Sequence, residues 1–141
     1  MRSMLYGLTL IFISLPAFAG NISVTDAWLR LLPGDLPLAG YVHVVNTGKH
    51  VVVLEGASSP EFSSVQMHRS VTSNGMETML PVGPMRIAPG DSVDFAPGGY
   101  HLMLMGRKHP LHIGERVPIT LNFGDNTHLM VEFVVRGATG Q

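Results

Sequence analysis

The sequence contains no cysteine among its 141 residues. This absence excludes thiolate nucleophiles, thiolate metal ligands and a disulfide framework. It also excludes a blue-copper electron-transfer centre, which requires a cysteine beside two histidines. The Gly-x-Ser-x-Gly signature of serine hydrolases is missing too, and no local Ser/His/Asp arrangement indicates catalysis. The composition therefore favours a binding protein over an enzyme.

Charge is equally scarce. Charged residues make up 13% of the chain, and the formal net charge is −1. No basic groove or polybasic segment is apparent, so neither nucleic acid nor an anionic membrane surface is an expected partner. Outside the N-terminal segment, no stretch of ten or more residues shows helical periodicity without an interrupting glycine or proline. Helices are therefore not expected.

The N-terminal segment has the features of an export signal. A short basic start is followed by the apolar run 4–15 and by Ala17-Phe18-Ala19, a small-x-small cleavage pattern. We predict a Sec-type signal peptide over residues 1–19 and a single domain over 20–141. The run is short for a membrane span, although an uncleaved anchor is the alternative. No cysteine follows the cleavage site, so we expect no lipid attachment there and no membrane insertion after cleavage.

The remaining chain is rich in short strand signals separated by turn residues. Alternating or β-branched segments recur at intervals of about ten residues. We expect strands over 22–31, 38–45, 50–54, 62–68, 76–80, 92–95, 100–105, 117–123 and 128–135, with 56–60 as a loop, 81–90 as a linker and Trp28 in the core. This spacing is typical of an all-β Greek-key sandwich or barrel.

Histidine and methionine concentrate around one of these strands. His101, Met103 and Met105 lie two apart, so a strand places them on one face, with Tyr100, Leu102 and Leu104 on the other. Imidazole and thioether form a soft, uncharged ligand set, which suits Cu(I) better than Zn(II). The segment therefore indicates a candidate Cu(I) site.

Methionine more often fills gaps in a core, so each residue alone proves little. Met67 precedes His68 on a predicted strand and should face away from it, into the core. Met105 shares a face with Met103, and whether it contributes to the site stays open. No metal role is assigned to the other methionines or histidines, which are Met76, Met85, Met130, His43, His50, His109, His112 and His128.

The joint spacing is more specific than any single residue. Ten residues separate His68 from Met79, twenty-one separate Met79 from His101, and one separates His101 from Met103. This H-x10-M-x21-H-x-M pattern resembles the periplasmic PCuAC-type copper chaperone family. The segments 25–28 (Thr-Asp-Ala-Trp), 46–48 (Asn-Thr-Gly), 56–60 and 97–106 carry the same resemblance, which covers nearly the whole chain after residue 19.

The resemblance implies a cupredoxin-like β-sandwich that binds one Cu(I) per chain. By that resemblance the ligands are His68, Met79, His101 and Met103. It further implies a periplasmic metallochaperone whose acceptor is a cytochrome c oxidase subunit or assembly factor, and we expect the protein to be a monomer. Two departures stand out: the family's extra methionine beside the first histidine is replaced by Arg69 and Ser70, and the His- and Met-rich C-terminal tail of some relatives is absent.

Three alternatives remain at this stage. A copper buffer for tolerance would bind the metal without a dedicated acceptor. An exported interaction module would use the methionine-rich face to dock another protein. An oxidase or reductase would have to cycle copper through Cu(II), which thioether ligands oppose.

Overall fold

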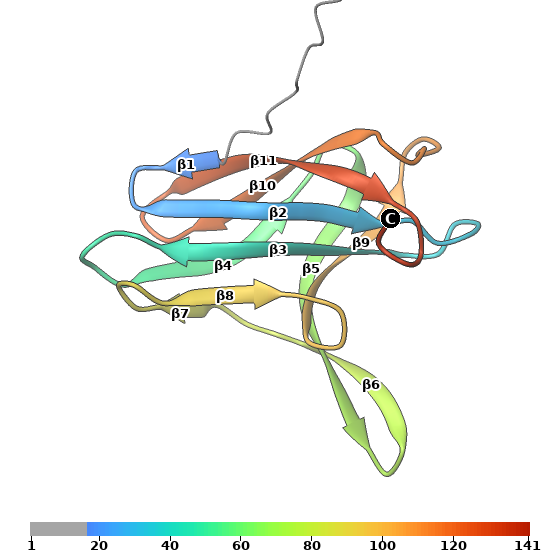
Figure 1. Ribbon diagram of the computed structural model, residues 1–141, viewed down its shortest axis with the longest axis horizontal. Coiled ribbons are helices and arrows are strands. Elements are labelled where there is room, and N and C mark those ends of the chain that lie inside the picture. Colours follow the sequence, from blue (N-terminus) through green and yellow to red (C-terminus); the bar gives the residue numbers. More distant parts are fainter. Residues whose placement is uncertain (1–16) are drawn as a thin grey trace, which may run out of the picture.

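The computed structural model describes residues 17–141, and every regular element in this part of the chain is a β-strand (Figure 1). Residues 1–16, which hold most of the predicted signal peptide, lie outside the described residues. The strands are β1 (Ala17–Ala19), β2 (Ile22–Arg30), β3 (Leu38–Asn46), β4 (Val52–Ser58), β5 (Phe62–Ser73), β6 (Met76–Pro81), β7 (Met85–Ile87), β8 (Ser92–Phe95), β9 (Tyr100–Arg107), β10 (Arg116–Phe123) and β11 (Thr127–Arg136).

The strands form one continuous hydrogen-bonded path that folds over on itself. The order is β6-β5-β9-β8-β3-β2-β11-β10-β4-β7, with β1 paired to β2 and a further pairing between β9 and β3. Strands β5 and β4 are each next to an end of this path, at opposite ends, and yet contact each other. The sheet therefore closes into a sandwich around a single interior (Figure 1). This arrangement confirms the prediction of an all-β sandwich.

Alternation along the strands builds the core. In β10 and β11 every second residue is buried, so one face of each strand packs inward. The most deeply buried apolar side chains, none more than 1% exposed, include Leu29, Val44, Leu54, Leu102, Leu104, Ile119 and Phe133. Leu102 and Leu104 anchor β9 to this core, and the intervening residues of β9 consequently face outward.

The structure differs from the sequence expectations at several segments. The expected linker 81–90 contains β7, which pairs with β4, and β4 continues through 56–58, which were expected to form a loop. Prolines at either side of β7 obscured a strand of only three residues. Strand β1 lies inside the predicted signal peptide, and it pairs with Ile22–Val24 of β2. Strand β2 also pairs with β3 between Ile22 and Arg30 and with β11 at Trp28–Arg30, so cleavage after Ala19 would leave Ile22–Val24 paired with β3 alone.

Trp28 is not a core residue, contrary to the prediction. Ile22 and Val24 face the core, so simple alternation would turn Trp28 inward as well. A β-bulge between Thr25 and Trp28, where Asp26 has a φ of +55°, shifts the register. After the bulge Leu29 is buried instead, and Trp28 lies half-buried on the outer face.

In the described part of the chain, no helix has the length and apolar character needed to cross a membrane.

Gly40 allows β3 to approach the core closely, which makes it a test of the packing behind β9. A Cβ at Gly40 would lie 3.2 Å from atoms of Leu29, Leu102 and Leu104. We expect Gly40→Val to lower the free energy of unfolding by roughly 1–3 kcal/mol because the added methyl groups overpack the interior. Urea denaturation measures the difference. Gly56→Val is the matched control, since a Cβ there meets nothing within 4 Å; an equal loss in both variants would contradict the packing argument.

Candidate metal centre

Two histidines face each other across neighbouring strands. The antiparallel register of β5 and β9 pairs His68 directly with His101, and the ring centroids lie 5.9 Å apart. The preceding pair, Met67 and Leu102, points to the opposite face and is buried in the core. The prediction that Met67 faces away from His68 is thereby confirmed, and both imidazoles lie on the outer face of these strands.

Each imidazole has one engaged nitrogen and one nitrogen without a partner. His68 Nε2 lies 3.0 Å from Gln66 Oε1, and His101 Nδ1 lies 3.5 Å from the Gly99 carbonyl oxygen. These oxygens can only accept, so the engaged nitrogens carry the hydrogen. The lone pairs therefore belong to Nδ1 of His68 and Nε2 of His101. Both of these atoms are buried and have no hydrogen-bond partner.

Such a pair of unpartnered atoms is unusual in a folded protein. His101 is only 4% exposed, and a buried acceptor without a donor costs on the order of 1–3 kcal/mol. Two imidazole lone pairs on adjacent strands are suited to a metal ion that prefers nitrogen and sulfur. No group of three or more His, Cys, Asp or Glu side chains gathers anywhere in residues 17–141, so carboxylates do not complete the site.

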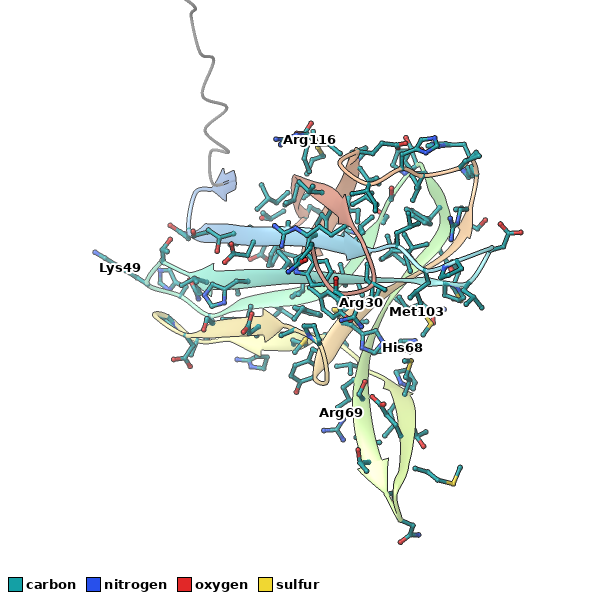
Figure 2. The ribbon with its side chains drawn as sticks, turned by 45° about the vertical axis from the view of Figure 1, so that its right-hand side comes forward. Arg30, Lys49, His68, Arg69, Met103 and Arg116 are labelled. Atoms are coloured by element: carbon teal, nitrogen blue, oxygen red, sulfur yellow. The ribbon has the colours of Figure 1, made fainter. Side chains whose placement is uncertain are left out.

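A thioether lies beside this pair. Met103 is two residues beyond His101 on β9 and therefore shares its face. Its cross-strand neighbours are Gln66 on β5 and Ala39 on β3, and the small Ala39 side chain crowds it little. Figure 2 shows His68 and Met103 close together where the β5–β6 hairpin leaves the sandwich. Met105 is one step further along the same face, opposite Ser64.

Met79 lies on the same face but at the other side of the histidine pair. It is opposite Ser70, whereas His68 is opposite Pro81, so Met79 is a diagonal neighbour of His68. Its side chain is 51% exposed on the edge strand β6. The structure thus brings His68, His101 and Met103 together and leaves Met79 at the rim. The four-ligand set stays a prediction.

The environment of His68 favours the neutral form of its imidazole. Burial lowers the pKa of His68 below its ordinary value, and a positive charge on His101 lowers it further. A metal ion requires the neutral form, so the lowered pKa reduces competition from protons.

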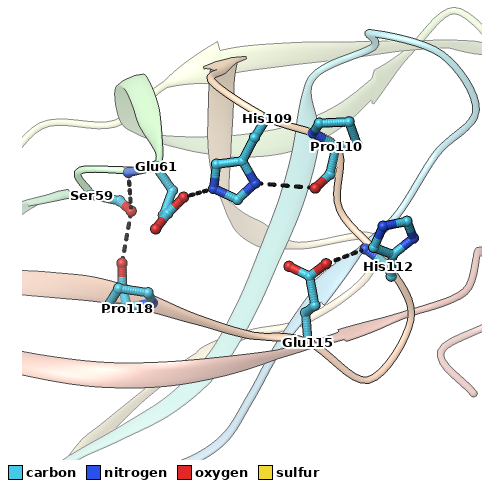
Figure 3. Close-up of polar contacts among 7 residues, drawn as sticks. All are labelled: Ser59, Glu61, His109, Pro110, His112, Glu115 and Pro118. Carbon is cyan, nitrogen blue, oxygen red and sulfur yellow. Dashed lines mark hydrogen bonds and ion pairs between the residues drawn. The ribbon is translucent and has the colours of Figure 1, made fainter.

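Three of the remaining histidines contact other side chains or backbone groups. His109 Nε2 contacts the Glu61 carboxylate and its Nδ1 lies 3.1 Å from the Pro110 carbonyl oxygen (Figure 3). His43 lies 3.4 Å from Asp94, and His128 lies 2.8 Å from Asn122. None of these contacts joins the His68–His101 pair.

Two contributors to the site were missed by the sequence analysis. Gln66 shares a face with His68 because it is two residues away on β5, and that spacing was the available signal. Tyr41 follows Gly40, which pairs with Leu102, so it lies on β3 at the level of His101. Only the strand pairing of β3 with β9 reveals this second neighbour.

Known structures share the fold of this chain. The copper-bound PCuAC domain from PmoF2 superimposes with a TM-score of 0.73 and 26% identity, covering 88% of this chain and 99% of that domain. The apo form of DR1885 from Deinococcus radiodurans gives a TM-score of 0.65 and 28% identity, with coverage of 97% and 93%. Its CuI form gives 0.63 and 32%, with coverage of 78% and 74%.

The fold and the paired imidazoles therefore define a cupredoxin-like β-sandwich of the PCuAC copper-chaperone type, as the sequence resemblance implied. Residues 22–135 match the family model described as "LpqE-like: Putative lipoprotein LpqE-like". The "Putative lipoprotein Lxx21020" of Leifsonia xyli subsp. xyli is 37% identical over 146 residues, which cover 98% of this chain and 87% of that protein. The chain belongs to the LpqE-like family.

The lowered pKa of His68 leads to a prediction about pH. Because its pKa is lower in the folded state than in the unfolded chain, protonation of His68 opposes folding. We expect its contribution to the stability of the metal-free protein to be complete above the unfolded-chain value and to decline as the pH falls through it. An NMR titration of the imidazole protons should place the midpoint of His68 in the folded protein below its midpoint in the urea-unfolded chain, which serves as the reference. The opposite order would contradict the burial effect.

A second prediction concerns the tautomer of His68. In the native protein Gln66 accepts from Nε2, which leaves Nδ1 free to bind. We expect Gln66→Leu to remove this preference, so that a substantial fraction of His68 moves to the Nδ1–H tautomer in the metal-free protein. Long-range ¹H–¹⁵N correlation spectra distinguish the two tautomers. The Gly99 carbonyl is unchanged in this variant, so His101 should keep its tautomer and serve as the control.

Proposed function

We propose that this protein binds one Cu(I) ion and passes it to a partner protein. The observation that carries the proposal is the pair of buried, unpartnered lone pairs on His68 Nδ1 and His101 Nε2. The neighbouring Met103 supplies a soft sulfur on the same face. Two neighbours of known structure are described as copper-bound and CuI-bound, which supports the choice of metal.

The donor chemistry suits a metal ion that is transported and takes no part in catalysis. Imidazole and thioether are neutral, so they stabilise Cu(I) without the deprotonation that thiolate ligands require. Neither group forms disulfides in an oxidising compartment, as cysteines would. The same set disfavours Cu(II), so redox catalysis at this site is not part of the proposal.

The position of Met79 suggests how the ion is received and released. His101 is buried, whereas Met79 is half-exposed on an edge strand of a projecting hairpin (Figure 1). A partner can approach Met79 without entering the sandwich. In the proposal Met79 completes the ligand set, and the partner replaces it first, so the copper moves by stepwise ligand exchange.

The destination and the compartment belong to the same proposal. The predicted signal peptide and the lipoprotein description of the family support an exported protein acting in the periplasm. The PCuAC resemblance supports a cytochrome c oxidase subunit or assembly factor as the acceptor. A copper buffer is the competing proposal, and it differs in predicting release that does not depend on the acceptor.

An anaerobic Cu(I) titration against a competing chelator tests the binding step. We expect one equivalent to bind to the parent protein, and we expect the Met79→Ala, Met103→Ala variant to bind on the order of a hundredfold more weakly because two soft ligands are lost. Met130→Ala is the matched control, since Met130 is an exposed methionine on β11, remote in sequence from the site. Equal affinity in all three proteins would refute the proposed site.

The same loaded protein distinguishes delivery from buffering. A transfer rate that rises linearly with the concentration of an added copper acceptor indicates ligand exchange within a complex. A rate that is independent of that concentration indicates spontaneous dissociation and supports the buffer instead.

A further inference from the structure

An aromatic and cationic cluster lies beside the histidine pair. We call it the Trp28 platform; it consists of Trp28, Tyr41, Arg30 and Arg136. The rings of Trp28 and Tyr41 are 4.7 Å apart, and the Arg30 guanidinium lies 5.8 Å and 5.2 Å from their centroids. The Arg136 guanidinium lies 5.5 Å from the Trp28 ring. Both arginines are therefore held by cation–π contacts.

The strand register places this platform next to the proposed copper site. Trp28 is paired with Tyr41, and Tyr41 lies on β3 at the level of His101. Two residues further along β2, Arg30 pairs with Ala39 on β3, and Ala39 pairs in turn with Met103 on β9. Arg30 and Met103 are thus two strand spacings apart, about 10 Å. All of these side chains alternate onto the face opposite the core.

The two positive charges have no carboxylate partner. None of the ion pairs within residues 17–141 includes Arg30 or Arg136, and Arg30 Nε is buried without a hydrogen-bond partner. Glu77 is near enough to influence Tyr41, and Asp94 is engaged by His43. The terminal segment packs at the edge of the platform, where a Cβ at Gly140 would lie 3.2 Å from the Trp28 ring.

We propose that the Trp28 platform docks an acidic segment of the protein that accepts the copper. This inference rests on the proposed function. Tryptophan, tyrosine and arginine are the residues that dominate binding energy at protein interfaces, and here the tilted ring pair and the cation–π contacts already hold their side chains. Two unpaired guanidinium groups attract carboxylates and orient them by paired hydrogen bonds. An acidic segment bound there would hold the acceptor's copper ligands beside Met103 and Met79.

The test uses two synthetic peptides and the fluorescence of Trp28, the one tryptophan in the chain. Both peptides carry a Met-x-x-Met copper site; one is followed by four aspartates and the other by four asparagines. We expect the acidic peptide alone to shift the Trp28 emission of the metal-free protein at low salt. We also expect it to accept Cu(I) from the loaded protein about tenfold faster than the neutral peptide.

Matched variants distinguish the effect of the Trp28 platform from the effect of net charge. The Arg30→Gln, Arg136→Gln variant should show neither the emission shift with the acidic peptide nor the faster copper transfer to it. Lys49→Gln with Arg116→Gln removes the same charge at sites away from the platform and should preserve them (Figure 2). Arg30→Lys with Arg136→Lys keeps the charge and should retain part of the preference, which distinguishes lost docking from a folding defect.

Several results would overturn the inference. It fails if both peptides behave alike, if the preference survives in the Arg30→Gln, Arg136→Gln variant, or if the Lys49→Gln, Arg116→Gln variant loses it equally. The outcome also separates this inference from the proposed function. An emission shift without copper transfer to either peptide would support the docking surface and contradict the proposed chaperone function. Equal copper transfer to both peptides would support the chaperone function and contradict the docking surface.

Discussion

The pairing register of β5 with β9 is the constraint on which the site depends. It sets His68 opposite His101 and at the same time places Met67 and Leu102 in the core. Because side chains alternate along a strand, a slip of one residue would bury His68 and expose Met67. The burial of Leu102 and Leu104 makes that slip costly. The hydrophobic core therefore fixes the geometry of two polar side chains that lie on its outer side.

The unpartnered nitrogens follow from how each ring is held. Each imidazole donates one hydrogen bond, His68 to Gln66 Oε1 and His101 to the Gly99 carbonyl oxygen, and this bond selects a tautomer and fixes the ring. This is the arrangement seen when a histidine binds a metal through its other nitrogen. The cupredoxin-like fold does not by itself provide electron transfer here, because no cysteine is available. The proposed function depends on the side chains on one face of the sheet.

Much of the fold was predictable because strand and turn signals are local. Period-two alternation located β9 and correctly turned Met67 inward. It failed at Trp28, where the Asp26 bulge reverses the alternation and no sequence signal marks the bulge. The contact of Arg30 and Arg136 with the Trp28 ring could not be predicted from the sequence either, because it depends on the parallel pairing of β2 with β11.

The candidate site was predictable in its residue types and less so in its arrangement. Spacing placed His101 and Met103 on one face, and resemblance added His68 and Met79. The diagonal position of Met79 depends on the β5–β6 register, which pairs Met79 with Ser70 and not with His68. The exposed fraction of that side chain depends in turn on how far the hairpin projects from the sandwich (Figure 1).

The exposure of Met79 has a chemical consequence for the durability of the site. A half-exposed thioether on an edge strand is open to oxidants, whereas Met67 is sealed in the core. Oxidation to the sulfoxide would replace a soft sulfur donor by a harder oxygen and add polarity and bulk. The damage would begin at the ligand proposed to leave first, while the two imidazoles stayed intact. Reduction of that single side chain by a methionine sulfoxide reductase would then restore the donor set.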